Sequence, residues 1–331
     1  MKMKTIFCKA MGAVALAIAS FSSAYAQTPK EITVGYFLEW PTANLFAQVN
    51  GWYDKELGVK VNWRAFDAGT AMSAAMASGD IQISYSQGLI PFIVATSQGL
   101  PIEAVGIAAA YDENDNCVVR KGTGITKNNA KKLEGQTVAV PIGSVSHYKL
   151  LRILSHLGVN PLKVKIVDMA PADGAAALAR GDVAMACGWG GALVRMKKFG
   201  SVLMTAREQQ AIGIRVFDLI TVTDDFAKKN PELVTKFLAV TDRSAKYLTD
   251  HPDQAMPVIS KAAGMNAKAG AAMIKLFTFP TKDKQLSHYL DGTVQAYTKG
   301  VADFLVQQKQ MPSALSSYSA VFSDKFYKNV K

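Results

Sequence analysis

A short motif that occurs twice in this chain constrains its fold more than any other feature. Ala77-Ser78-Gly79-Asp80-Ile81 in the first half and Ala179-Arg180-Gly181-Asp182-Val183 in the second both end a run of small residues at a glycine and continue into a β-branched segment. Glycine at this position favours the left-handed backbone conformation that ends a helix. The repetition predicts two lobes of similar construction, each with a helix that leads directly into a strand.

The segments around both copies of the motif alternate between strand and helix patterns. β-Branched runs predict strands at Ile32–Phe37, Val59–Arg64, Ile81–Tyr85, Pro101–Ala109, Thr137–Pro141, Val164–Asp168, Val183–Cys187 and Val202–Thr205. Helices are expected at Thr42–Asn50, Gly69–Ala77, Leu89–Ser97, Val145–Leu157, Pro171–Arg180 and Ala192–Phe199. Strands that alternate with helices of this length form βαβ units. We therefore predict an α/β fold with parallel-rich sheets and flanking helices.

The pattern becomes mainly helical after Val222, which suggests how the lobes are connected. The helices expected there are Pro231–Leu248, Pro252–Ala263, Ala267–Lys275 and Lys282–Gln308. We expect this segment to pack on the first lobe, with Cys117–Arg120 and Val216–Val222 as two crossover strands. Two strands between lobes form a hinge. The predicted division is residues 27–117 plus 220–331 for lobe 1 and residues 118–219 for lobe 2.

The N-terminal residues 1–26 have the pattern of a secretory signal peptide. Lys2 and Lys4 precede an apolar run from Met11 to Phe21, and Ala24-Tyr25-Ala26 forms a small-residue cleavage site. The apolar run is shorter than the roughly 20 residues that a membrane-spanning helix needs. We predict cleavage after Ala26 and a soluble protein exported to the periplasm.

Composition excludes several other classes of function. The formal net charge of +11 is spread over dispersed lysines and arginines, so no basic patch for nucleic acid is predicted. The histidines are scattered without metal-ligand spacing, and no metal or cofactor is expected. Cys117 and Cys187 lie in strand-like runs, and two alternatives stay open for them: a disulfide or two buried free thiols.

Polar and aromatic residues follow the predicted strands, where ligands bind in open α/β sheets. The candidates are Glu39, Trp40, Asp67, Ser86, Gln87, Ser146, His147 and Trp189, with Asp115 and Asp218 near the crossovers. Backbone N–H groups at helix starts bind anions, and a tryptophan face binds cations. The structural alternatives are that Thr70 and Ser144 only cap helices and that Trp189 fills a core.

Catalytic patterns are not found at these positions. Ser144 and Ser146 stand beside His147, but no G-x-S-x-G elbow is present. Gly122-Thr123-Gly124 lacks the strand-to-helix context of a dinucleotide fingerprint. We predict a binding protein and not an enzyme.

The order and spacing of several landmarks resemble the periplasmic receptors of taurine and alkanesulfonate ABC importers. The matching pieces are Asp67-Ala68-Gly69, the segment from Ala77 to Ile83, Val138–Pro141 followed by Ser146-His147-Tyr148, Arg180–Val183, Trp189 and Asp218. The resemblance implies a two-lobe periplasmic-binding-protein fold with a two-strand hinge, a monomer, and an ABC permease as partner. It also implies a sulfonate at Ser86, Gln87 and Ser146 with His147 adjacent. The ammonium group is expected at Asp218 and Asp115, beside Trp189.

Three segments depart from the pattern of these receptors. Ser86-Gln87-Gly88 replaces a Ser-Ser type of pair, Gly190-Gly191 replaces Ala-Pro, and Leu38-Glu39-Trp40-Pro41 is a variant of this chain. Glu39 and Trp40 favour a larger or more cationic ligand. Two alternatives therefore stay open: a receptor for another small zwitterion or amine, such as an aminophosphonate or a betaine, and an enzyme of the thiamine-precursor type. The chain has no cysteine-rich motif, which speaks against the enzyme.

Overall fold

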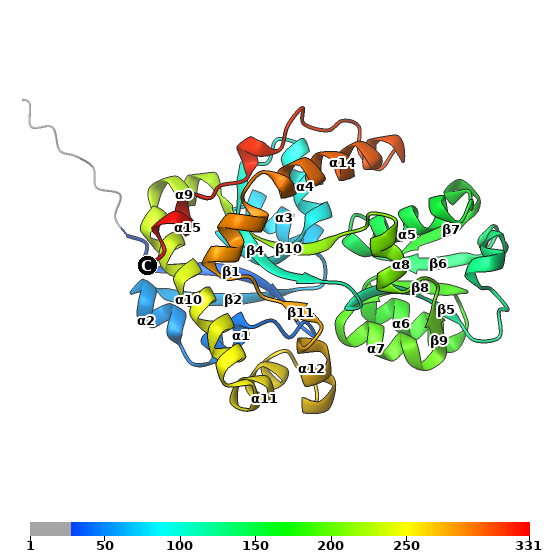
Figure 1. The fold of residues 1–331 in the computed structure, drawn as a ribbon, viewed down its shortest axis with the longest axis horizontal. Coiled ribbons are helices and arrows are strands. Elements are labelled where there is room, and N and C mark those ends of the chain that lie inside the picture. Colours follow the sequence, from blue (N-terminus) through cyan, green and yellow to red (C-terminus); the bar gives the residue numbers. More distant parts are fainter. Residues whose placement is uncertain (1–27) are drawn as a thin grey trace, which may run out of the picture.

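A computed structural model describes residues 28–331 as two sheets that lie side by side, each flanked by helices (Figure 1). The predicted signal peptide, residues 1–26, lies outside the described residues. Within residues 28–331, no helix has both the length and the apolar character that a membrane span requires. The predicted α/β fold with two lobes is confirmed.

The first lobe contains a mixed sheet in the order β11-β4-β10-β3-β1-β2. Its strands are β1 Glu31–Phe37, β2 Lys60–Phe66, β3 Ile83–Gly88, β4 Ile102–Tyr111, β10 Val216–Thr223 and β11 Phe277–Thr278. Strand β1 pairs in parallel with β2 and β3, and β10 runs antiparallel between β3 and β4. The carboxyl ends of β1 and β3 therefore lie at one edge of the sheet, where β10 brings in Asp218.

The second lobe contains a smaller sheet in the order β7-β6-β8-β5-β9. Its strands are β5 Asp115–Arg120, β6 Thr137–Val140, β7 Lys165–Asp168, β8 Met185–Trp189 and β9 Gly200–Val202. Strand β6 is parallel to β7 and β8, whereas β5 is antiparallel to β8 and β9. This arrangement repeats that of the first lobe, as the duplicated motif predicts.

Helices cover both faces of each sheet (Figure 1). Those of the first lobe are α1 Asn44–Val49, α2 Trp52–Leu57, α3 Gly69–Ala77, α4 Leu89–Ser97, α9 Asp224–Lys229, α10 Pro231–Asp250, α11 Pro252–Ala262, α12 Ala267–Ile274, α13 Lys282–Lys284, η3 Gln285–Tyr289, α14 Thr293–Gln307, η4 Ser319–Val321 and α15 Lys325–Asn329. The second lobe has η1 Lys127–Leu133, α5 Val145–His156, η2 Pro161–Lys163, α6 Pro171–Arg180, α7 Gly190–Phe199 and α8 Ala206–Ala211. The helices after Val222 pack on the first lobe, as expected.

The single helix predicted at Lys282–Gln308 is wrong, because α13 runs directly into the π-helical segment η3, and residues 290–292 separate both from α14. The side chain of Gln285 accepts a hydrogen bond from the Ile107 N–H at 2.9 Å and donates one to the Ile107 carbonyl at 2.8 Å. These bonds hold a π-helical turn against β4. Gly292, with φ of 105°, then redirects the chain into α14.

The chain passes between the lobes in two short segments, 112–114 and 212–215. Strand β5 pairs with β8 from its first residue, since Asp115 lies opposite Trp189. Strand β10 pairs with β4 from its own first residue, since Val216 lies opposite Tyr111. Each predicted crossover strand therefore belongs wholly to one sheet. The connections lie a few residues before the predicted boundaries at 117/118 and 219/220.

Cys117 and Cys187 form a disulfide, so the first of the two alternatives holds. The two residues lie directly opposite each other on the antiparallel strands β5 and β8, and both are buried. Their Sγ atoms are 2.06 Å apart. The bond joins residues that are 70 positions apart in sequence and fixes the centre of the second sheet.

Removal of this disulfide is expected to destabilise the second lobe. A crosslink that closes a loop of this length restricts the unfolded chain, and its loss costs about 2–4 kcal/mol. We expect the double variant Cys117→Ala/Cys187→Ala to unfold at a lower urea concentration than the wild type. Dithiothreitol in the denaturant should shift the wild type toward the variant and leave the variant unchanged. Coincident unfolding curves for both proteins without reductant would contradict a crosslinking role.

Candidate ligand-binding site

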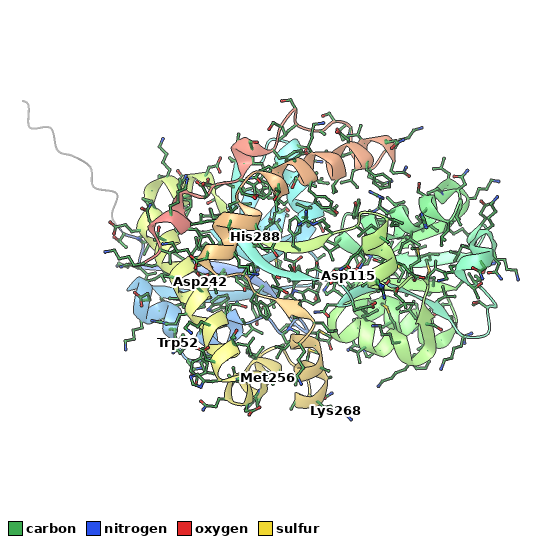
Figure 2. All side chains as sticks on the ribbon, viewed as in Figure 1. Trp52, Asp115, Asp242, Met256, Lys268 and His288 are labelled. Carbon is green, nitrogen blue, oxygen red and sulfur yellow. A yellow bond between two sulfur atoms is a disulfide. The ribbon has the colours of Figure 1, made fainter. Side chains whose placement is uncertain are left out.

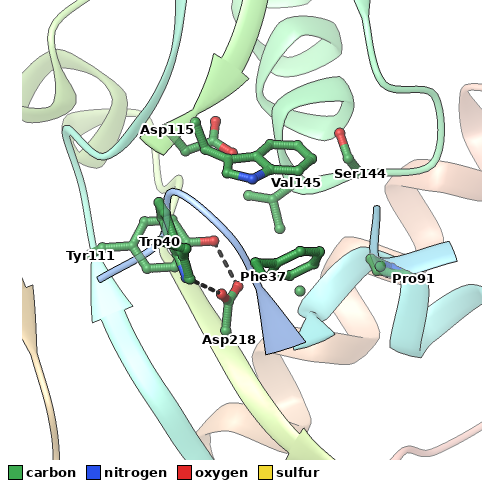
Figure 3. Close-up of a pocket in the computed structure, with 11 residues that line it drawn as sticks. Phe37, Trp40, Pro91, Tyr111, Asp115, Ser144, Val145 and Asp218 are labelled. Carbon is green, nitrogen blue, oxygen red and sulfur yellow. Dashed lines mark hydrogen bonds between the residues drawn. The ribbon is translucent and has the colours of Figure 1, made fainter. Parts of the chain in front are cut away.

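A cavity lies between the lobes, where residues of both come together. Figure 2 shows Asp115 at this boundary, close to where the ribbon passes from one lobe to the other. Residues of both lobes line the cavity: Phe37, Trp40, Gly69, Gly88, Pro91, Tyr111, Asp115, Ser144, Val145, Trp189 and Asp218 (Figure 3). A ligand held here would contact both lobes at once.

Asp218 is the most polar feature of the first-lobe wall. Its carboxylate accepts hydrogen bonds from Ser86 Oγ at 2.6 Å, Tyr111 OH at 2.7 Å and Trp40 Nε1 at 3.2 Å (Figure 3 shows the last two). Burial raises the pKa of Asp218 to about 7, although these hydrogen bonds act in the opposite direction. None of the described residues that line the cavity is basic. The Asp218 carboxylate therefore lacks a cationic partner that would offset its burial.

Asp115 lies on the second-lobe wall in a different environment. Its Oδ2 accepts a hydrogen bond from Ser146 Oγ at 2.8 Å, and its Oδ1 lies 3.8 Å from Lys149 Nζ. Lys149 is fully buried and also donates to the carbonyl oxygens of Asp112 and Asp115. Burial raises the pKa of Asp115 and lowers that of Lys149, while each charge favours the other. Asp115 is thus balanced by Lys149, and its Oδ1 has no hydrogen-bond donor among the described residues.

The starts of α3, α4 and α5 lie at the cavity. Gly69 is the first residue of α3, Gly88 precedes α4, and Val145 is the first residue of α5. The first N–H groups of a helix have no intrahelical acceptor and attract anions. No side chain caps α3 or α4, whereas Ser144 accepts the His147 N–H at α5. Figure 3 shows Ser144 and Pro91 on the side of the cavity away from Tyr111 and Asp115. The cavity thus offers carboxylates to a cation and helix N–H groups to an anion, and the two lie close together, since Gly88 pairs with Asp218 and Ser146 of α5 donates to Asp115.

The side chains predicted to hold an anion are engaged elsewhere. Ser86 and Ser146 donate their hydroxyls to Asp218 and Asp115. Gln87 lies outside the cavity lining, where it donates to Ser73 Oγ at 2.7 Å and accepts from Thr221 Oγ1 at 2.9 Å. The serines thus contact the carboxylates that line the cavity and do not line it themselves.

His147 is equally unsuited to supply a positive charge for an anion. Its Nδ1 accepts the Gly143 N–H at 3.3 Å. Burial lowers the pKa of His147 to about 4, so the ring is neutral near pH 7. Any anion in the cavity would therefore rely on backbone N–H groups.

Besides Gln87, the predicted residues that do not line the cavity are Glu39, Asp67, Ser86, Ser146 and His147. Asp67 is exposed at the end of β2. Glu39 points its carboxylate at Arg195 of α7. The prediction missed Phe37, Tyr111, Val145 and Lys149. The first two end strands β1 and β4, so the strand-end rule could have found them. A fully buried lysine has no comparable signal, because lysines are usually exposed.

No described group of three or more His, Cys, Asp or Glu residues is arranged to hold a metal ion. The carboxylates of the cavity are separated between the two lobes and are committed to hydroxyl, indole and lysine partners.

The pattern of a known family extends over most of both lobes. The sequence profile described as NMT1/THI5 like matches residues 42–255. The chain belongs to the NMT1/THI5-like family. Within it, the chain is 32% identical over 302 residues to the taurine-binding periplasmic protein of Escherichia coli strain K12, with 89% of this chain and 92% of that protein covered. A putative aliphatic sulfonates-binding protein of Bacillus subtilis strain 168 is 24% identical over 250 residues, 74% of each chain. The resemblance to taurine and alkanesulfonate receptors is confirmed.

Solved structures share the fold of this NMT1/THI5-like protein. The aliphatic sulphonate binding protein SsuA of E. coli superimposes with a TM-score of 0.73 at 21% identity, covering 91% of this chain and 100% of SsuA. The alkanesulfonate-binding protein SsuA of Xanthomonas axonopodis pv. citri, bound to MOPS, gives 0.74 at 17% identity, covering 89% and 98%. The desulfurization enzyme DSZB gives 0.66 at 15% identity, covering 91% and 99%. The fold is therefore common to binding proteins and to an enzyme.

Proposed function

We propose that this protein is a periplasmic solute receptor that captures taurine, or a closely similar small sulfonate, and delivers it to an ABC permease. The observation that carries the proposal is the pairing of an uncompensated buried carboxylate, Asp218, with uncapped helix starts at Gly69 and Gly88 in one cavity. A small zwitterion fits this pairing. The periplasmic location and the permease partner rest on the similarity to the taurine-binding periplasmic protein.

In this scheme, each charged group of the ligand pairs with groups of the protein, and the lobes close around the ligand. The ammonium group donates to Asp218 and to the free Oδ1 of Asp115, and the sulfonate accepts from N–H groups at the starts of α3, α4 and α5. Each charge that closure buries then has a partner, which burial requires. No bond is made or broken. In keeping with this, the described cysteines are joined in a disulfide, and the neutral His147 has no nucleophile as its partner.

A second ligand class, the betaine-like amines, is favoured by the aromatic lining. Phe37, Trp40, Tyr111 and Trp189 all line the cavity. The rings of Trp40 and Tyr111 meet edge to face at 4.9 Å beside Asp218. Aromatic faces attract methylated ammonium groups through cation–π contacts. A methylated amine would use these faces, whereas a primary ammonium would use the carboxylates.

A ligand panel separates the two classes and tests the proposal. The purified mature protein, unfolded and refolded to remove any bound solute, is titrated with taurine, ethanesulfonate, an aminophosphonate and glycine betaine. We expect taurine to give the largest rise in melting temperature, because a ligand stabilises the state that binds it. Betaine as the best ligand would favour the second class. Absence of binding by every sulfonate would overturn the proposal.

Taurine affinity should depend on pH through Asp218. Because burial raises the pKa of Asp218 to about 7, the carboxyl group is protonated in a growing share of molecules as the pH falls below that value. A neutral carboxyl group cannot pair with an ammonium, so we expect Kd to rise about tenfold between pH 8 and pH 6. Calorimetry at the two pH values measures this. The Asp218→Asn variant should show no such dependence, and a flat wild-type profile would contradict the assigned role.

A further inference from the structure

Two segments that the sequence analysis singled out meet across the boundary between the lobes. Glu39 follows β1 in the first lobe, and Gly190-Gly191 opens α7 in the second. The Arg195 guanidinium of α7 donates to both Glu39 carboxylate oxygens, at 2.6 and 3.0 Å. The Gly191 N–H donates to the Glu39 carbonyl oxygen at 3.2 Å. Glu39 thus binds the second lobe through both its backbone carbonyl and its side chain.

The two glycines allow this close approach. A Cβ atom on Gly190 would lie 2.3 Å from the Glu39 carbonyl oxygen, and one on Gly191 would lie 2.7 Å from the Glu39 carboxyl carbon. Real Cβ atoms do not come this close to other atoms. A larger residue at position 190 would therefore clash with the Glu39 backbone, whereas one at position 191 would displace only the end of the Glu39 side chain.

The Glu39 loop is anchored on its own lobe in an unusual conformation. Glu39 has φ of +54°, which is uncommon for a residue other than glycine. Its N–H donates to the Ala263 carbonyl oxygen at 2.8 Å, at the end of α11. Such a conformation persists where surrounding contacts hold it, and it often marks a functional site. Contacts within the first lobe thus fix the loop so that the Glu39 carbonyl and carboxylate face α7.

We propose that Glu39, Arg195 and Gly190-Gly191 form an interlobe latch that sets the population of the closed state and so the retention time of the ligand. The inference rests on the proposed receptor function. Neither Glu39 nor Arg195 lines the cavity, so both are positioning residues that act through closure. Their contacts join different lobes and are lost when the lobes separate. Ligand affinity scales with the closed fraction, and ligand selectivity does not depend on it.

The geometry sets the size of the effect. The side chains of Arg195 and Glu39 are 42% and 38% exposed, so water screens their charges in part. A bidentate arginine–carboxylate pair is stronger than a single contact, but exposed pairs remain weak. We expect loss of the pair to reduce taurine affinity by roughly three- to tenfold. The change should lie mainly in the dissociation rate.

The test uses Glu39→Gln, Arg195→Met and the double variant. Small-angle scattering of each ligand-free protein reports the closed fraction, and stopped-flow measurements report taurine association and dissociation. We expect each single variant to be more open and to release taurine roughly three- to tenfold faster, with little further change in the double variant. The preference for taurine over ethanesulfonate should stay unchanged. Arg64→Met is the matched control, because the Arg64–Asp80 pair has similar exposure but lies within the first lobe.

Each outcome separates the latch from the receptor function. Wild-type scattering and wild-type release rates in both single variants would overturn the latch, even if taurine binds. An altered ligand preference would also overturn it, because Glu39 would then contact the ligand. If no sulfonate binds, the receptor proposal fails, and the scattering comparison alone decides whether the pair holds the lobes together.

Discussion

Replacing Asp218 by asparagine is expected to weaken taurine binding by about 100-fold. Truncating one partner of a buried charge pair costs about 2–5 kcal/mol, which corresponds to roughly 30- to 5,000-fold in affinity. Asparagine has nearly the same shape but cannot balance an ammonium group. Three donors also converge on the Asp218 carboxylate, and the asparagine amide can accept only at one of its two atoms. Calorimetry on both proteins at pH 8 measures the loss.

Ethanesulfonate is the control ligand for this substitution, since it lacks the ammonium group. Its affinity should change by only a few fold, and equal losses for both ligands would contradict an ammonium site at Asp218. The control protein is Asp242→Asn. Burial also raises the pKa of Asp242, to about 6, and this residue accepts from Tyr327 OH within the first lobe. Figure 2 shows Asp242 well away from Asp115 at the lobe boundary. We expect its substitution to leave taurine affinity unchanged.

The Asp218→Asn substitution should also stabilise the ligand-free protein at alkaline pH. The folded-state pKa of Asp218 lies above its ordinary value near 3.8. Its contribution to stability is therefore greatest below that value and declines as the pH rises toward 7. Asparagine avoids the buried negative charge, so Asp218→Asn should melt above the wild type at pH 8. A residue that lowers stability without ligand and is needed for binding is typical of a functional site.

Gly190→Ala is expected to hold the lobes apart and to weaken taurine binding by about tenfold or more. The added Cβ would lie 2.3 Å from the Glu39 carbonyl oxygen, which is backbone and cannot swing away like a side-chain tip. The clash is between lobes, so separation relieves it while each lobe stays folded. If the closed state falls below a tenth of its population, the apparent affinity falls at least tenfold. Scattering and calorimetry should therefore change together.

Gly124→Ala is the matched control for backbone strain. Gly124 has φ of +64°, close to the +60° of Gly190, but a Cβ there would meet no atom within 4 Å. Both alanines carry the left-handed penalty of about 1–2 kcal/mol, and only Gly190→Ala adds the interlobe contact. Wild-type closure and affinity in Gly190→Ala would contradict the account of the Glu39 contact.

Much of the fold could be predicted because its signals are local. The bounds of α3, α4 and α6 were predicted without error, since a glycine or proline marks an end of each helix. The duplicated motif identified two lobes because a helix that stops at glycine has the same local chemistry in both copies. The residues near the cavity were found in part by the rule that parallel strands end at one edge of the sheet.

The partners of the site residues depend on tertiary contacts and could not be predicted. Ser86 and Asp218 are 132 positions apart, and Glu39 and Arg195 are 156 apart, so nothing in the sequence near either residue identifies the other. The serines were expected to bind a sulfonate, yet both donate to carboxylates because β10 and β5 bring Asp218 and Asp115 beside them. Lys149 in α5 partly balances the charge of Asp115, and nothing in the sequence of that helix marks the lysine as buried. The contacts between these serines and carboxylates thus depend on which strands lie side by side, and local sequence does not determine that.

A crystal structure of the mature protein grown with taurine tests the central claim most directly. The account predicts taurine between the lobes, with its nitrogen about 3 Å from the Asp218 carboxylate. Its sulfonate oxygens should contact backbone N–H groups at the starts of α3, α4 and α5. Taurine bound in the reverse orientation, or bound outside the cavity that Trp40, Trp189 and Asp218 line, would contradict the account.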